Sequence, residues 1–255
     1  MKRVLVCLLA LLMLTALAAC DLRNRKDSED FFPEESDLPG WNGFDSPTNR
    51  QEKQSDEAVV VKTVMEYSGD LPYSSPPQEY SYQLPMIDLA GAQAVGCNQE
   101  IENVFGTLIR QSMDAIQEYQ TPILAQLSYS YYVYSGILTL RVLRQDTDGQ
   151  ITTAYYTVNA KNGEAVSLAE LFRTAGISGT PDTVVNDALL ERFTSRFGKL
   201  EGADPAVTTA LNQTQAELFP LSPNRMYITE DGRLSVRFML YAPNGGSSIE
   251  EIILP

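Results

Sequence analysis

The chain has 255 residues, 44% of them hydrophobic, with 33 acidic and 19 basic side chains and a formal net charge of −14. This length is enough for one sizeable hydrophobic core or two small ones. The acidic balance argues against nucleic acid and anionic lipid headgroups as partners. It favours either a cationic protein partner or a charged surface that keeps the protein soluble.

The composition includes no histidine. This excludes Ser-His-Asp and Cys-His catalysis as usually built, together with histidine-based zinc sites. An enzyme made from this chain would have to use carboxylates, Tyr, Lys or Ser. We therefore expect no cofactor and no metal, and we assign no catalytic residue from the sequence.

The first twenty residues have the layout of a secretory signal peptide. Two basic residues precede an apolar run from Val4 to Leu17, and two alanines then precede Cys20. This ending resembles the lipobox of bacterial lipoproteins, which predicts cleavage between Ala19 and Cys20 and a diacylglyceryl lipid on Cys20. The alternative is an uncleaved anchor, but the apolar run is short of the roughly 20 residues that a membrane span needs. We expect a membrane-anchored protein on the extracytoplasmic face.

Residues 21–57 are acidic and polar, and Pro and Gly interrupt them repeatedly. Such a composition cannot bury enough apolar surface to order itself, so it predicts a disordered linker. The predicted organisation is a signal peptide at 1–19, a lipidated linker at 20–57 and a folded domain at 58–255. Cys97 has no partner left for a disulfide, and we expect it to be a small buried hydrophobe.

The folded part begins with two predicted strands, at 58–67 and 80–87. An apolar stripe with spacings of three and four then predicts a helix over 98–119, with Asn98 as its N-cap. Alternating residues over 124–144 predict a hairpin that turns at Ser135-Gly136.

A further strand is predicted at 151–159. Ser167 opens a capping box before a short helix that reaches Phe172, and two more helices follow at 181–197 and 204–219. A hairpin around Asp231-Gly232 and a last strand at 249–254 complete the chain. Blocks of strands and helices with tight turns predict an α+β fold, with a mainly antiparallel sheet and two or three helices packed on it, rather than βαβ units.

Three groups of residues are candidates for a site. The first is an aromatic run that consists of Tyr129, Tyr131, Tyr132 and Tyr134. Its flat rings could stack on the faces of sugars. Alternation along the strand, however, places two rings on each side of the sheet, which is the arrangement that ordinary cross-strand packing produces. The segment 146–149 resembles the start of a calcium loop without its later ligands, so a hairpin turn explains it better. The neighbouring acids at 230–231 and 250–251 are the kind that a glycosidase uses, but their spacing selects no pair.

Several segments together resemble one bacterial extracytoplasmic domain family. The first segment is Leu84-Pro85-Met86-Ile87, which fits the opening of the family's domain. The second is Tyr156 to Phe172, which ends in Leu168-Ala169-Glu170-Leu171-Phe172 and matches the family's "L-x-(D/E)-L-F" helix. The last are Met226 to Leu234, Tyr241-Ala242-Pro243 and Gly246, which resemble its closing hairpin and final strand. The family occurs in lysozyme-sensing anti-sigma factors and beside peptidoglycan deacetylases in Gram-positive bacteria, and also in lone lipoproteins. The resemblance covers roughly residues 58–255 and implies the fold and a location outside a single-membrane cell. It implies no enzyme activity, because this chain has no deacetylase domain and no histidine to ligate that domain's metal. Residues 144–150 also stand where family members often carry a histidine-containing turn.

The sequence thus predicts a non-enzymatic, lipid-anchored domain that binds or senses a ligand, either a cationic protein or peptidoglycan. Tyr129, Tyr131, Tyr132 and Tyr134 are the candidate ligand contacts. Two alternatives stay open: a carboxylate-based hydrolase of wall glycan, and a structural or assembly lipoprotein of the envelope.

Overall fold

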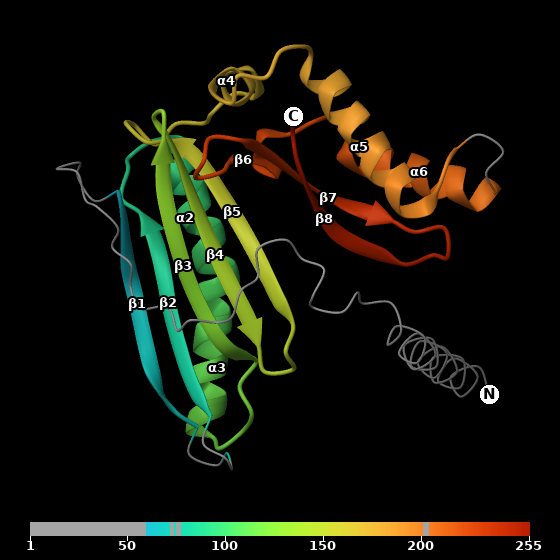
Figure 1. Cartoon of the computed structure of the whole chain (residues 1–255). Coiled ribbons are helices and arrows are strands. Elements are labelled where there is room, and N and C mark those ends of the chain that lie inside the picture. The colour runs from blue at the N-terminus through green and yellow to red at the C-terminus, as the bar shows by residue number, and fades with distance from the viewer. Residues whose placement is uncertain (1–59, 72–73, 75–77, 201–203) are drawn as a thin grey trace, which may run out of the picture. The chain divides into compact units, whose positions relative to one another are not determined.

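The computed structural model describes residues 60–71, 74, 78–200 and 204–255 (Figure 1). The predicted signal peptide, the predicted lipidation site Cys20 and the predicted linker lie outside the described residues. Within the described ranges, no helix is long and apolar enough to cross a membrane.

A five-stranded sheet forms the first half of the domain. Its strands are β1 (Val61–Asp70), β2 (Glu79–Ile87), β3 (Leu124–Tyr134), β4 (Ile137–Asp146) and β5 (Ile151–Asn159), and they lie side by side in that order. Neighbouring strands are antiparallel except for β2 and β3, which are parallel. The predicted α+β fold with a mainly antiparallel sheet is confirmed. The parallel pairing of β2 with β3 is an exception. It requires one βαβ crossover, which the sequence pattern did not indicate.

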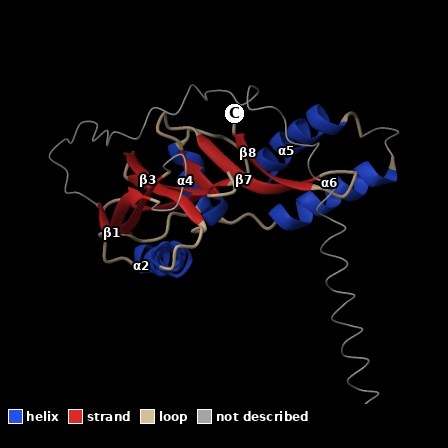
Figure 2. Ribbon diagram, turned by 90° about the horizontal axis from the view of Figure 1, so that it is seen from below, coloured by secondary structure: helices blue, strands red, loops and turns tan. Residues whose placement is uncertain are grey.

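The crossover is a long helical segment on one face of this sheet (Figures 1 and 2). It consists of α2 (Ala92–Ile101), one π-helical turn η2 (Glu102–Gly106) and α3 (Thr107–Gln117). Alternate residues of the strands meet apolar residues of the helix in a first core. This core includes Tyr82, Leu84, Ile101, Ile109, Leu127, Leu140 and Val158. Cys97 belongs to the same core and is 5% exposed, which confirms that it is a buried hydrophobe.

The predicted start of this helix is wrong. The helix begins at Ala92 after Gly91, six residues before Asn98. Asn98 lies inside the helix, and its amide caps a strand instead: Oδ1 accepts from the Ile87 N–H at 2.8 Å and Nδ2 donates to the Ile87 carbonyl at 2.9 Å. Val104, one of the apolar residues spaced at three and four in this segment, is 43% exposed, because it lies within the π-helical turn that shifts the apolar stripe.

The second half consists of three helices and a small sheet. The helices are α4 (Leu168–Thr174), α5 (Pro181–Phe197) and α6 (Pro205–Leu218), and a short 3-10 turn, η3 (Pro223–Arg225), follows them. The sheet contains β6 (Met226–Ile228), β7 (Leu234–Tyr241) and β8 (Ser247–Ile253), all antiparallel. The predicted cap is confirmed, because Ser167 Oγ accepts from the Glu170 N–H at 3.2 Å.

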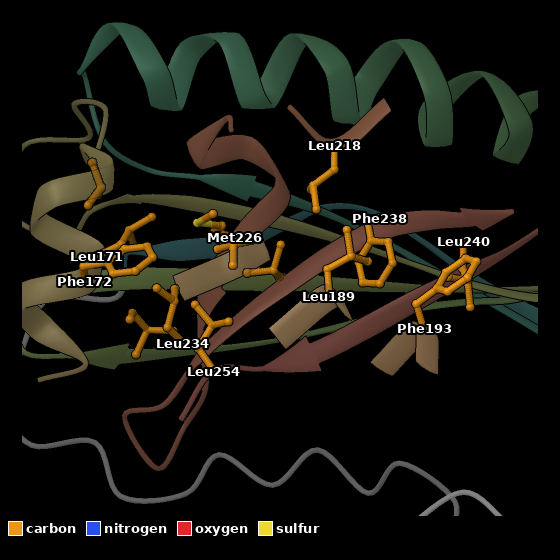
Figure 3. Close-up of a cluster of buried hydrophobic side chains, with 14 of the residues drawn as sticks. Leu171, Phe172, Leu189, Phe193, Leu218, Met226, Leu234, Phe238, Leu240 and Leu254 are labelled. Atoms are coloured by element: carbon orange, nitrogen blue, oxygen red, sulfur yellow. The ribbon is translucent and has the colours of Figure 1, made fainter. Parts of the chain in front are cut away.

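One face of the small sheet packs against these helices and forms a second core (Figure 3). Alternate residues of β7 point into it, namely Leu234, Val236, Phe238 and Leu240, and they meet Leu189 and Phe193 of α5 and Leu218 of α6. The described domain therefore has two hydrophobic cores, one on each sheet.

Strand β6 joins the two halves. The Tyr132 and Thr139 hydroxyls of the large sheet both donate to the Ile228 carbonyl of β6, at 2.7 and 3.1 Å. The Thr157 hydroxyl donates to the Met226 carbonyl at 3.3 Å. These three residues lie on the sheet face opposite the helix, so β6 lies across that face at the end of β3, β4 and β5.

Candidate functional site

The four candidate tyrosines of β3 do not form one platform. Tyr129 and Tyr131 lie on the helix side of the sheet, and Tyr132 and Tyr134 lie on the other side, as the alternation predicts. The Tyr129 hydroxyl is hydrogen-bonded to the Thr63 hydroxyl at 2.7 Å, and Tyr131 is 38% exposed. The structure therefore does not bring these rings together on one surface.

The two tyrosines on the far side serve the contact between the halves of the domain. Tyr132 is hydrogen-bonded to β6, and burial raises the pKa of its phenol to about 12. Tyr134 packs against the second core, with its ring directly over Gly232. Both rings are therefore held by packing and hydrogen bonds.

The acidic neighbours are not aligned over a common cleft. Glu250 and Glu251 are adjacent on β8 and point to opposite faces: Glu250 forms ion pairs with Arg192 and Arg196 of α5, whereas Glu251 accepts from the Tyr227 hydroxyl at 2.8 Å. Asp231 is in the β6–β7 turn and pairs with Arg233 at 2.7 Å. Each of these three carboxylates is held by an arginine or a tyrosine.

The remaining candidate is the turn at 146–149, which joins β4 to β5 as an ordinary hairpin. Asp146 is 7% exposed and forms a two-bonded ion pair with Arg144, at 2.7 and 2.6 Å. No cluster of three or more metal-ligating side chains is found in the part of the chain that the structure describes.

A pocket with a different set of residues lies where the two halves meet. We call it the seam pocket. It has a volume of about 210 Å³ and is lined by Ala154 and Tyr155 of β5, Asn224 and Arg225 of η3, Tyr227 of β6 and Arg237 of β7. Two of its six lining residues are arginines and none is a carboxylate, although acids outnumber bases in this chain by 33 to 19.

A stacked pair of tyrosines forms one wall of the seam pocket. The rings of Tyr155 and Tyr227 are parallel within 6°, with 3.8 Å between their centroids. Tyr155 alternates with core residues of β5 and so points away from the helix, toward β6. Burial raises the pKa of Tyr227 far above its usual value, so its hydroxyl stays protonated and donates to Glu251. The stack fixes this wall and joins the two sheets.

Two arginines supply the charge. Arg225 is the last residue of the helical turn η3 and forms an ion pair with Glu217 at 2.6 Å. Arg237 alternates with the core residues Val236 and Phe238 and therefore points away from the second core, toward the seam pocket. Its nearest carboxylate, Glu251, is 3.9 Å away. Guanidinium groups bind carboxylates and phosphates through paired N–H groups, so this arrangement suits an anionic group on a ligand.

In comparisons with known proteins, no family model and no curated protein matches the chain. The chemistry of the seam pocket therefore has to be read from its own residues. The sequence analysis did not find Tyr155, Arg225, Tyr227 or Arg237, because they come from separate segments. The only signal in the sequence was that Tyr155 and Arg237 occupy non-core positions of alternating strands.

Proposed function

We propose that this chain is a lipid-anchored extracytoplasmic protein whose folded domain binds peptidoglycan without catalysing a reaction on it. The observation that carries the proposal is the seam pocket, which presents two arginines and no carboxylate in a chain of net charge −14. Arg225 is already paired with Glu217 at 2.6 Å, whereas Arg237 has only a 3.9 Å contact with Glu251. The Arg237 guanidinium therefore keeps N–H groups that suit a local anionic group on a ligand.

Two features of the sequence support the cellular location. The lipobox-like ending at Cys20 supports a domain tethered outside a membrane, and residues 21–57 are long enough to separate it from the bilayer. The resemblance of residues 58–255 to a Gram-positive extracytoplasmic family points to the same compartment. Peptidoglycan is the polymer that such a tethered domain meets first.

Co-sedimentation tests the binding. The full chain, extracted from membranes in detergent, is mixed with purified peptidoglycan sacculi and centrifuged. We expect the protein in the pellet with saturable binding, and no release of soluble glycan fragments. Protein that stays in the supernatant at low and moderate salt would contradict the binding, and release of fragments would favour the hydrolase alternative.

The anchor is tested with the same preparation. The chain from the membrane fraction is expected to begin at Cys20 and to carry a diacylglyceryl group, as measured by intact mass. A Cys20→Ser variant should accumulate as unprocessed precursor without lipid. Normal maturation and acylation of the Cys20→Ser variant would show that Cys20 is not the lipidation site.

A further inference from the structure

Arg237 and Arg141 stand out among the nine arginines of the described residues by how little their guanidinium groups are paired. Six of the nine form ion pairs at short range. Arg173 has only a 4.0 Å contact with Glu170, but its side chain is 79% exposed and water solvates it. The Arg237 side chain is 23% exposed, and its one ionic contact is 3.9 Å long.

The remaining arginine, Arg141, lies next to the same tyrosine stack. It is the cross-strand partner of Tyr155 in the β4–β5 register, and its Nε is buried without a hydrogen-bond partner among the described residues. Neither the Arg141 nor the Arg237 guanidinium donates a hydrogen bond to any group in the described ranges. A largely buried guanidinium without acceptors is unfavourable, because it loses water without gaining hydrogen bonds.

The seam pocket is partly open to solvent and has a volume of about 210 Å³. A small anionic group can enter it beside Arg237 while the rest of a larger ligand stays outside. The Asn224 amide lines the same pocket and can both donate and accept beside the arginines.

Resting on the proposed function, we infer that the seam pocket binds a carboxylate end group of peptidoglycan, held between Arg237 and Arg225 against the Tyr155–Tyr227 stack. A carboxylate has two oxygens in the plane of the guanidinium fork, so it can occupy the donors that Arg237 leaves unused. Arg141 adds positive potential from the next strand. Two peptidoglycan groups carry this chemistry. One is the terminal carboxylate of the stem peptide. The other is the lactyl carboxylate of muramic acid, which is free only where the stem peptide has been removed, because an amide bond to the peptide otherwise occupies it.

Titration calorimetry on the full chain in detergent tests the inference. N-Acetylmuramic acid is compared with N-acetylglucosamine, which lacks the lactyl carboxylate, and N-acetyl-D-alanyl-D-alanine forms a second arm for the peptide carboxylate. We expect one of the two carboxylates to bind and N-acetylglucosamine not to bind. Equal binding of N-acetylglucosamine, or equally strong displacement of the carboxylate by inorganic phosphate, would overturn the carboxylate assignment.

Arg237→Gln removes the charge and keeps a side chain of similar reach. It should weaken binding by about tenfold or more, the effect of one charge-assisted hydrogen bond. Arg173→Gln is the matched control, because its ion pair is equally long but exposed, and it should bind as the parent does. Unchanged binding by Arg237→Gln would overturn the inference.

A second variant and a second readout separate the possible failures. If Arg237→Gln does not fold, Arg237→Lys keeps the charge but loses the paired N–H geometry and should still weaken binding. If sacculi bind the parent and Arg237→Gln equally, the proposed function stands but the seam pocket is not the peptidoglycan-binding site. Carboxylate binding without sacculus binding would leave the pocket assignment intact and remove peptidoglycan as the ligand.

Discussion

Gly232, in the turn between β6 and β7, is a position where two separate constraints exclude a side chain. Its φ of +84° lies in the left-handed region, and a Cβ placed there would stand 2.3 Å from Cζ of Tyr134. Gly149, in the turn between β4 and β5, shares the first constraint with a φ of +88°, but nothing lies within 4 Å of a Cβ at that site. Comparing substitutions at the two glycines therefore distinguishes the cost of backbone strain from the cost of steric overlap.

We predict that Gly232→Ala is clearly more destabilising than Gly149→Ala. The backbone term alone should lower the free energy of unfolding by about 1–2 kcal/mol at Gly149. Overlap with the Tyr134 ring should add about 1–3 kcal/mol at Gly232. Urea unfolding of both variants measures the difference, and equal losses would show that the Tyr134 ring does not pack on this turn.

The same comparison bears on the candidate tyrosines. In a Tyr134→Ala background the extra loss at Gly232 should disappear, because the overlapping ring is gone. A ring that a glycine turn holds in this way is a structural element of the second core. Any ligand contact by the tyrosines of β3 would therefore have to come from Tyr131, the most exposed of the four.

At the scale of elements, Asn98 fixes how the long helix meets the sheet. Its side chain satisfies both backbone groups of Ile87 at the end of β2, where the chain leaves the strand and turns toward the helix. Each of these backbone groups is an obligatory hydrogen-bonding group that is costly to leave unpaired in a partly buried place. One side chain thereby ties α2 to β2.

We predict that Asn98→Ala lowers the free energy of unfolding by about 2–3 kcal/mol, the cost of two unsatisfied backbone groups. Gln99→Ala, at the exposed neighbouring position on the same helix, should change it by less than about 0.5 kcal/mol. Chemical denaturation of both variants provides the measurement. Similar small effects from the two substitutions would mean that water replaces the Asn98 amide and that the helix is not tied to β2.

The elements that the sequence predicted correctly carry local signals. Ser167 and Glu170 lie three residues apart, and the Ser135-Gly136 turn lies within the hairpin that it closes, so neighbouring residues alone decide both structures. The start of the long helix was missed because residues 92–97 include Gly96 and small residues, which give a weak apolar stripe, while Asn98 has a strong capping preference. The parallel pairing of β2 with β3 depends on a crossover of more than thirty residues, which no local pattern encodes.

At the scale of the whole described domain, two cores are joined through few contacts, and the Ile228 carbonyl is central to them. It accepts from Tyr132 and Thr139, and Thr139 is fully buried. The seam pocket lies along the same junction, so its geometry depends on how the two sheets are held together. This explains why the sequence revealed strands and turns but not the pocket: its walls come from both sheets, which only the tertiary fold brings together.

The junction makes a prediction that a double-mutant cycle can test. Tyr132→Phe and Thr139→Val each remove one hydroxyl from the Ile228 carbonyl and leave the other, so each should cost about 1 kcal/mol. The double variant should cost more than the sum, because the carbonyl then has no side-chain donor in a buried place. Tyr129→Phe with Thr63→Val is the contrast at an exposed site, where the two hydroxyls bond each other at 2.7 Å. Either substitution alone removes that bond, so the double variant should cost no more than the sum of the two, and the total should be small.

Hydrogen exchange then locates the loss. If Ile228 joins the two cores, the double variant at Tyr132 and Thr139 should speed exchange of the β7 amides more than that of the β4 amides, since β7 belongs to the smaller sheet and loses its support first. Uniform acceleration of both strands would mean that the cores unfold as one unit and that other contacts dominate the junction. Carboxylate binding at the seam pocket should weaken in the same variant, because Arg237 lies on β7 and Tyr155 on β5, and the pocket requires both sheets to keep their relative position.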